Sequence, residues 1–280
     1  MKFSVKKEFK DRLKIYKKDQ KEKEKRKEPN KNVFVIDFEG DIKASGVSHL
    51  RDEISTILSL SDNCSEVVLR LESPGGMVHS YGLAASQLLR LKENNIPLTV
   101  CVDKVAASGG YMMACVADKI ISAPFAIVGS IGVLAQVPNF HRLLKKNDVD
   151  YQEITAGEYK RTISIFGEIT EKGKQKFTDD IARTHELFKN WVSQRRPKVK
   201  ITEVATGEHW YGQEVLEKGL VDEIKTSDQY IMELIPHFQV FTLKVSGKRS
   251  FQEKLQESFG QIVENRLPEW VLAWQNKRWY

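Results

Sequence analysis

The sequence is poor in cysteine and has no long apolar run. Its 280 residues include only Cys64, Cys101 and Cys115, at spacings that fit neither a disulfide framework nor a zinc site. Cys101 and Cys115 lie in apolar segments, where thiols usually serve as small core residues. No stretch reaches the roughly 18 apolar residues of a membrane span, and no signal-peptide pattern is present. From the sequence we therefore expect a soluble or peripheral protein without a metal or other cofactor.

Positive charge is scarce outside the first 32 residues. The chain carries a net charge of +6, but residues 1–32 hold 14 Lys and Arg against 6 Asp and Glu, which leaves the remainder at −2. The body lacks the basic stripe with interleaved aromatics that nucleic-acid binding uses, so we expect no nucleic-acid partner. The basic segment is either a solvated arm or a contact to an anionic membrane surface.

Composition predicts three parts. Residues 1–32 form a basic tail or linker, residues 33–240 a single domain with a sizeable core, and residues 241–280 an amphipathic extension. In the extension, an apolar stripe from Phe251 to Trp274 ends beside Lys277 and Arg278. Such a stripe suits a membrane interface, and it equally suits packing on a partner subunit or on the domain.

Strand and helix patterns alternate through the central domain. Helical spacing or helix-forming residues predict helices over 47–60, 78–94, 111–117, 140–148 and 168–195, and one from 210 that stops at Gly219. Short apolar runs predict strands over 33–38, 65–72, 96–102, 119–123 and 150–154. This alternation predicts an α/β fold with a parallel sheet and crossover helices.

Ser108 lies on the turn between a predicted strand and a predicted helix, and two glycines follow it. A serine there can be a nucleophile close to unpaired N–H groups, or an ordinary helix N-cap. A second turn, Ser73-Pro74-Gly75-Gly76, follows another predicted strand. Because carboxyl ends of adjacent parallel strands lie together, the two turns can aim two N–H groups at one oxygen, as in an oxyanion hole. Alternatively, Pro-Gly-Gly is simply a good turn.

A nucleophilic serine needs a base, and the residues leave two candidates, His79 and Lys160. His79 lies just past the Gly-Gly turn, and Lys160 lies among small and aromatic residues. Lysine is protonated at neutral pH unless apolar surroundings favour the neutral amine. We expect the other histidines in polar contexts, at 49, 185 and 209, to be surface residues.

Five motifs in order resemble the signal peptide peptidase family of serine proteases. They are Leu71-Glu72-Ser73-Pro74-Gly75-Gly76, Ala107-Ser108-Gly109-Gly110-Tyr111, Val128-Gly129-Ser130-Ile131-Gly132-Val133, Gly157-Glu158-Tyr159-Lys160 and Gly219-Leu220-Val221-Asp222. The resemblance covers roughly residues 33–230, and five ordered motifs are far more specific than any one. It implies a crotonase/Clp-like spiral of ββα units, here with N- and C-terminal helical extensions.

The resemblance also implies the site. Ser108 is then the nucleophile, Lys160 the general base, and Ser130 the residue that orients the lysine amine. The oxyanion hole falls on the N–H groups of Gly75 and Gly109. We expect an apolar substrate pocket, to which the chain offers Gly76, Met77, Val78 and Met112. The related Clp proteases use a histidine after Gly-Ser-Ile-Gly, and residues 133–139 contain none, which favours lysine.

The implied activity is an ATP-independent endopeptidase that cleaves membrane-derived, signal-peptide-like or unfolded peptides. Family members form homo-oligomers at the bacterial inner membrane, here on the periplasmic side, and in some the lysine comes from a neighbouring subunit. Such proteins usually begin with a membrane-spanning helix, whereas this chain begins in the basic tail. Two rival functions remain. One is a crotonase-type acyl-CoA enzyme, which needs carboxylates in the site; the other is a catalytically silent, membrane-associated scaffold.

Overall fold

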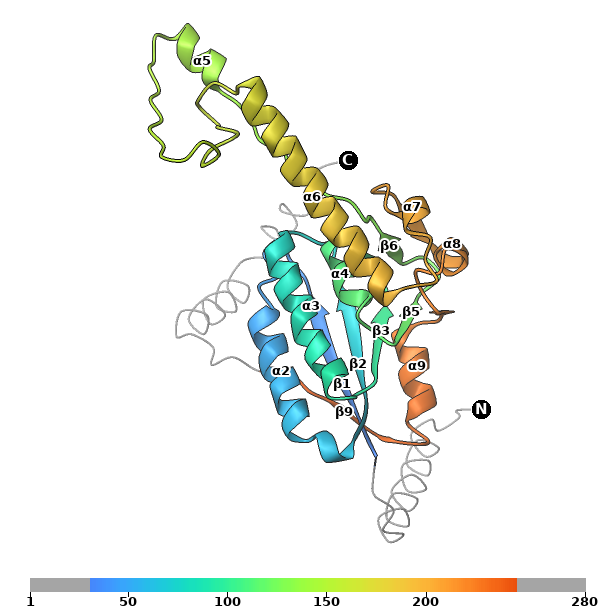
Figure 1. The fold of residues 1–280 in the computed structure, drawn as a ribbon. Coiled ribbons are helices and arrows are strands. Elements are labelled where there is room, and N and C mark those ends of the chain that lie inside the picture. The colour runs from blue at the N-terminus through green and yellow to red at the C-terminus, as the bar shows by residue number, and fades with distance from the viewer. Residues whose placement is uncertain (1–30, 246–280) are drawn as a thin grey trace, which may run out of the picture. The chain divides into compact units, whose positions relative to one another are not determined.

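The computed structural model describes residues 31–245. The chain divides into two units, Met1–Leu243 and Lys244–Tyr280. Residues 1–30 of the expected basic tail and the apolar stripe of the C-terminal extension lie outside the described residues, while Asn32, expected in the tail, begins β1 (Asn32–Glu39). Figure 1 shows the fold of the described part.

Most of the strands form one parallel sheet. Six strands lie in the order β8-β5-β3-β2-β1-β9, and every neighbouring pair is parallel. A smaller sheet has the order β4-β6-β7, in which only the β6–β7 pair is antiparallel. The strands are β1 Asn32–Glu39, β2 Cys64–Glu72, β3 Leu98–Val102, β4 Val105–Ala107, β5 Lys119–Ser122, β6 Ile127–Gly129, β7 His209–Tyr211, β8 Glu223–Ile224 and β9 Gln239–Thr242.

Helices cover both faces of the large sheet. They are α2 Val47–Ser59, α3 Val78–Glu93, α4 Gly109–Ala114, α5 His141–Lys146, α6 Glu171–Arg195, α7 Ile201–Val204, α8 Gly212–Glu217 and α9 Ser227–Leu234, with a 3₁₀ turn at Ser61–Asn63. Side chains alternate along β1, so Phe34 and Ile36 enter the main core with α2 and α3, while Val33 and Val35 pack in a second cluster with α9.

The small sheet and α4 place Ser108. β3 lies in the large sheet, and the next strand, β4, lies in the small sheet and is followed by α4. These three elements form one ββα unit of the predicted spiral. β5 and β6 repeat this step ahead of α5 and α6. The predicted α/β fold with a mostly parallel sheet is therefore confirmed.

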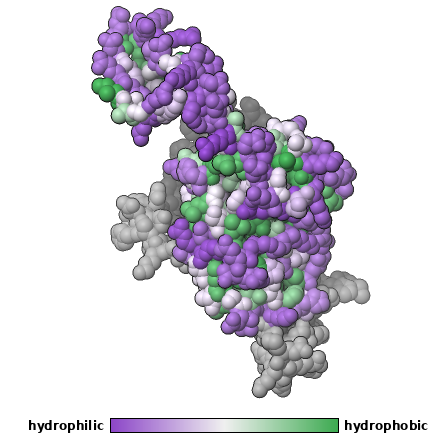
Figure 2. All heavy atoms as spheres, in the orientation of Figure 1, coloured by the Kyte–Doolittle hydropathy of each residue, from purple (hydrophilic) through white to green (hydrophobic). Residues whose placement is uncertain are grey.

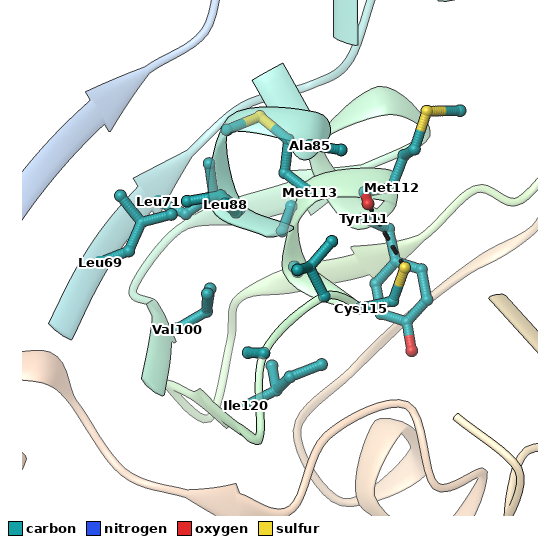
Figure 3. Packing of buried hydrophobic residues seen from close by; sticks show 14 of the residues in the cluster. Leu69, Leu71, Ala85, Leu88, Val100, Tyr111, Met112, Met113, Cys115 and Ile120 are labelled. Carbon is teal, nitrogen blue, oxygen red and sulfur yellow. Dashed lines mark hydrogen bonds between the residues drawn. The ribbon is translucent and has the colours of Figure 1, made fainter. Parts of the chain in front are cut away.

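α4 is buried along its whole length. Tyr111 and Met113 are fully enclosed, and Figure 3 shows them among core side chains of β2, β3, β5 and α3. Cys101 and Cys115 are core residues, as expected, and burial raises the pKa of each thiol to about 12. The position of Ser108 is therefore fixed by a packed core rather than by a surface loop.

Several sequence-based assignments were wrong. Residues 150–154 form no strand, and Ile154 is 94% exposed. β4, α9 and β9 were not predicted, and Trp210, expected in a helix, lies in β7. Leu187, expected on the buried stripe of the long helix, is 63% exposed, while Phe188 beside it is buried. Short strands and helices carry too few residues for a periodic signal, which explains most of these errors.

Residues 133–170 form a segment that we call the arm. Figure 1 shows α5 and its neighbouring loops at the N-terminal end of α6, away from the sheet. Packing within the arm is local: the Phe166 ring lies against those of Phe140 and Tyr151, and Asn139 Nδ2 donates to the carbonyls of Ser164 and Gly167. Figure 2 shows the arm surface as mostly hydrophilic with scattered apolar side chains. Leu134 and Ile154 of the arm are strongly exposed.

Candidate active site

Ser108 has a strained backbone between β4 and α4. Its φ is 52° and its ψ −116°, outside the conformations that an L-residue adopts easily. Its side chain makes no capping hydrogen bond, although it occupies the N-cap position. Its N–H donates to the Gly129 carbonyl at 2.8 Å, which ties it to the end of β6. The ordinary N-cap interpretation therefore fails, and a strained serine on a strand-to-helix turn resembles a nucleophile elbow.

The glycine turn lies directly against Ser108. Gly75 has φ +91°, and a Cβ added there would stand 2.7 Å from Gly109 N and 2.8 Å from Ser108 Cβ. Within the described residues, the Gly109 N–H has no acceptor. The Gly75 N–H, in contrast, donates to Ser73 Oγ at 3.1 Å. The two predicted turns do meet, but the Gly75 N–H already has a partner.

A small pocket opens at Ser108. Its lining comes from four parts of the chain and includes Gly76, Val78, Ser108, Gly109, Met112, Gly132, Val133, Thr184 and Phe188. Of the residues expected to contact substrate, Gly76, Val78 and Met112 line it. Met77 does not; its N–H donates to the Ile42 carbonyl instead. Among residues 31–245, no carboxylate lines this pocket, whereas a crotonase-type enzyme needs carboxylates in its site.

Two lining residues, Thr184 and Phe188, were not anticipated as part of a site. Phe188 lies on the predicted apolar stripe of α6, but periodicity cannot distinguish a core residue from a pocket wall. The indole N–H of Trp191, one turn further along α6, donates to the Met112 carbonyl at 3.0 Å. α6 is thus held against α4 beside the nucleophile.

Lys160 lies far from Ser108 within one chain. Its neighbour Tyr159 stacks against the ammonium groups of Lys172 and Lys176 in the first turns of α6. The Ser108 pocket contacts α6 at Thr184 and Phe188, about twelve residues further on, which corresponds to about 18 Å of helix. Lys160 is exposed, and no interaction of its ammonium group is found among residues 31–245. The structure does not bring Ser108 and Lys160 together in a single protomer.

Ser130 directly follows β6, and its N–H donates to the Glu208 carbonyl at 2.6 Å. His79 is exposed, its imidazole makes no hydrogen bond within the described part of the chain, and it is not among the described residues that line the pocket. His185, expected at the surface, is half-buried instead. Its Nε2 lies 3.2 Å from the Ile131 carbonyl, so the ring donates through that nitrogen.

Comparison with known proteins identifies the family of this chain. The family model described as peptidase family S49 matches residues 90–241, and the N-terminal model of the same family matches residues 1–88. The chain belongs to peptidase family S49. The signal peptide peptidase resemblance inferred from the motifs is thereby confirmed.

Members of family S49 with curated names include close relatives. A probable protease SohB of Haemophilus influenzae is 60% identical over 232 residues, which cover 83% of this chain and 65% of that protein. A probable protease SohB of Buchnera aphidicola is 50% identical over 246 residues, 88% of this chain and 72% of that protein. The chain thus spans about two thirds of the length of these relatives. Among solved structures, a mutant of the membrane-bound stomatin-specific protease 1510-N matches with a TM-score of 0.48 and 15% identity, covering 78% of this chain and 99% of that one.

Two further properties of this S49 chain concern metals and membranes. Within residues 31–245, no group of three or more His, Cys, Asp or Glu side chains is placed to hold a metal ion. In the same residues, no helix combines the length and apolar character needed to cross a bilayer.

Proposed function

We propose that this S49 chain is a serine endopeptidase with Ser108 as nucleophile and Lys160 as general base. The observation that carries the proposal is the strained Ser108 at the mouth of a pocket beside the unpaired Gly109 N–H. Family membership and the resemblance to proteins named as proteases support the same reaction class. The apolar side chains of Val78, Met112 and Phe188 around the pocket suit a peptide with apolar residues.

In the proposed reaction, the free amine of Lys160 removes the proton from Ser108 Oγ as that oxygen attacks the scissile carbonyl. The tetrahedral oxyanion accepts hydrogen bonds from the Gly109 N–H and from the glycine turn. Lys160 then protonates the leaving amine, and the same lysine activates the water that hydrolyses the acyl-enzyme.

For the second oxyanion donor we favour Gly76 over Gly75, the residue expected from the sequence. The Gly75 N–H is donated to Ser73 Oγ, whereas Gly76 lines the Ser108 pocket and its N–H has no acceptor within the described residues. Gly76 also packs so closely on the Ile42 carbonyl that a side chain could not be accommodated.

We further propose that Lys160 is supplied by a neighbouring copy of the chain, so that the active form is a homo-oligomer. The separation of Lys160 from Ser108 along α6 and the exposed apolar side chains of the arm both support this arrangement. Burial against a neighbour would also strip water from the ammonium group, which favours the neutral amine that a base requires. Membrane-derived or unfolded peptides as substrates, and a site on the periplasmic side of the inner membrane, remain part of the proposal.

Labelling with a fluorophosphonate probe tests the catalytic pair. Wild type should be labelled at Ser108, Ser108→Ala should not be labelled, and Lys160→Ala should be labelled far more slowly. Equal labelling of all three proteins would exclude the pair. A complete lack of labelling in an oligomeric wild type would favour the silent scaffold.

A further inference from the structure

Beneath the glycine turn lies a buried chain of hydroxyl groups. The Gly75 N–H lies 3.1 Å from Ser73 Oγ, Ser73 Oγ lies 2.6 Å from Tyr81 Oη, and Tyr81 Oη lies 2.8 Å from the Asp41 carbonyl. Ser73 and Tyr81 are both 0% exposed. These hydrogen bonds thus link the turn beside Ser108 to the segment that follows β1.

The two ends of the chain fix its direction. A carbonyl can only accept a hydrogen bond, so Tyr81 donates to Asp41; a backbone N–H can only donate, so Ser73 accepts from Gly75. The remaining proton, on Ser73 Oγ, then points to Tyr81 Oη. Each hydroxyl donates once and accepts once, and such fully satisfied buried networks hold one geometry. Burial also raises the pKa of Tyr81, which keeps its hydroxyl protonated and donating.

The Tyr81 ring also contacts the other oxyanion donor. A Cβ added to Gly109 would stand 2.7 Å from Tyr81 Cδ2 and 2.9 Å from Tyr81 Cβ. One side chain therefore supports the Gly109 backbone with its ring and the Gly75 backbone through its hydroxyl. These are the two sides between which an oxyanion would bind.

The segment after β1 completes the support. The Gly40 N–H donates to the Glu72 carbonyl at 2.9 Å, and the Ile42 carbonyl accepts the Met77 N–H at 2.8 Å. A side chain on Gly40 would collide with Ser73 Oγ and Tyr81 Oη. Residues 40–42 thus hold the turn on both sides of the hydroxyl chain.

We infer that Tyr81 is a positioning residue for the oxyanion hole, acting through the Ser73 hydroxyl on the Gly75–Gly76 turn. This inference rests on the proposed function. Tyr81 does not line the pocket, so its effect on catalysis is indirect. Without its hydroxyl, Ser73 Oγ loses its acceptor, and Gly75, which has the conformational freedom of glycine, is no longer held in place.

The test compares Tyr81→Phe, Ser73→Ala and the double variant in the full chain, with Tyr230→Phe as matched control. Tyr230 likewise has a hydrogen-bonded hydroxyl, which donates to Glu66 Oε1 at 2.7 Å, but the residue is half-buried and lies on α9 at the opposite face of the sheet. Three quantities are measured: the rate of fluorophosphonate labelling at Ser108, kcat and KM on a peptide, and amide hydrogen exchange over residues 73–77.

We expect Tyr81→Phe to lower kcat and the labelling rate about tenfold to a hundredfold with KM little changed, somewhat less than the loss of a whole oxyanion donor. Amide hydrogen exchange in the turn should rise. The double variant should react no more slowly than Ser73→Ala, because Tyr81 and Ser73 act through the same series of hydroxyl hydrogen bonds. Tyr230→Phe should match wild type.

The inference is overturned if a folded Tyr81→Phe variant keeps wild-type kcat and labelling rates, or if the rate losses of Tyr81→Phe and Ser73→Ala multiply in the double variant. If Tyr81→Phe does not fold, Ser73→Ala provides the test, and wild-type rates in that variant would likewise overturn the inference. The exchange measurement separates the two proposals. If exchange rises but wild type shows no Ser108-dependent labelling, the proposed function fails while the hold of Tyr81 on the turn stands.

Discussion

Ser108 and Ser130 lie side by side at the carboxyl ends of two paired strands. Ala107 on β4 and Gly129 on β6 are register partners, and each serine is the next residue along its strand. The Ser108 N–H donates to the Gly129 carbonyl, and both serines have positive φ, 52° and 51°. The strand pairing therefore places the backbones of the two serines at neighbouring positions of the small sheet.

We therefore expect Ser130→Ala to reduce activity without unfolding the protein. If Ser130 orients the lysine amine, its loss should lower kcat about tenfold or more, within the about 10²–10⁴-fold that a positioned base contributes. Steady-state peptide hydrolysis and Ser108 labelling measure the effect. Ser122→Ala is the control: Ser122 is a fully buried serine at the end of β5, and its hydroxyl donates to the Ala123 carbonyl at 3.1 Å. Equal activity of the two variants would remove Ser130 from the mechanism.

A methyl group at Gly75 should abolish activity. The methyl carbon would stand 2.7 Å from the Ala107 carbonyl oxygen and 2.8 Å from Ser108 Cβ. The positive φ of residue 75 adds backbone strain of about 1 kcal/mol for an alanine. Gly207→Ala is the matched control, since Gly207 has φ +87° but open space around its Cβ position. We expect both variants to lose similar backbone stability, and only Gly75→Ala to lose Ser108 labelling. Labelling of Gly75→Ala at the wild-type rate would show that the turn does not form part of the site.

Much of this site was accessible from the sequence because it depends on backbone. The sequence has two predicted strands that are each followed by a glycine-bearing turn and a helix. This pattern predicted that Ser108 and Gly75 would lie together at one edge of a parallel sheet, and they do. Local sequence patterns could not predict contacts between residues that are far apart in the sequence. The bond from Trp191 to the Met112 carbonyl joins residues 79 positions apart, and no local periodicity encodes it. The same limit applies to Tyr81, whose helical context predicts an ordinary core residue rather than a bond to Asp41.

A partly buried ion pair, Arg196 with Asp222, should make the stability of this fold depend on pH. The Arg196 guanidinium holds both carboxylate oxygens of Asp222 at 2.8 Å, and Asp222 also accepts the Ile120 N–H. Burial alone would raise the pKa of Asp222, but these donors outweigh it and lower that pKa below its usual range. A lowered native pKa stabilises the fold above the ordinary Asp value of about 3.9, and this stabilisation is lost as the pH falls through the native value.

Asp222→Asn should therefore destabilise the protein at neutral pH, because it leaves the buried Arg196 charge without its partner. Since the Asp222 side chain is 34% exposed, we expect clearly less than the about 3–5 kcal/mol that breaking a fully buried pair costs. The difference in unfolding free energy between wild type and Asp222→Asn should become smaller at acidic pH, because protonation of Asp222 in wild type removes the same charge. Urea unfolding of both proteins at about pH 7 and at a series of lower pH values, down to about pH 2, measures this difference in unfolding free energy. A difference independent of pH would mean that the carboxylate charge contributes nothing.

Mixed oligomers test whether Lys160 acts on the Ser108 of a neighbour. Neither Ser108→Ala nor Lys160→Ala should be active alone. When the two are co-expressed with different tags and hetero-oligomers are isolated, a Lys160→Ala copy keeps its serine and can receive lysine from an adjacent Ser108→Ala copy. With random assembly and head-to-tail contacts, about a quarter of all sites are complete, so activity should return to about a quarter of wild type. If lysine acts within its own chain, no site in the mixture is complete, and the isolated hetero-oligomers should stay inactive. The result matters for the fold as well, because recovery requires the arm to reach a neighbouring pocket, whereas inactivity requires it to fold back along α6 by about 18 Å.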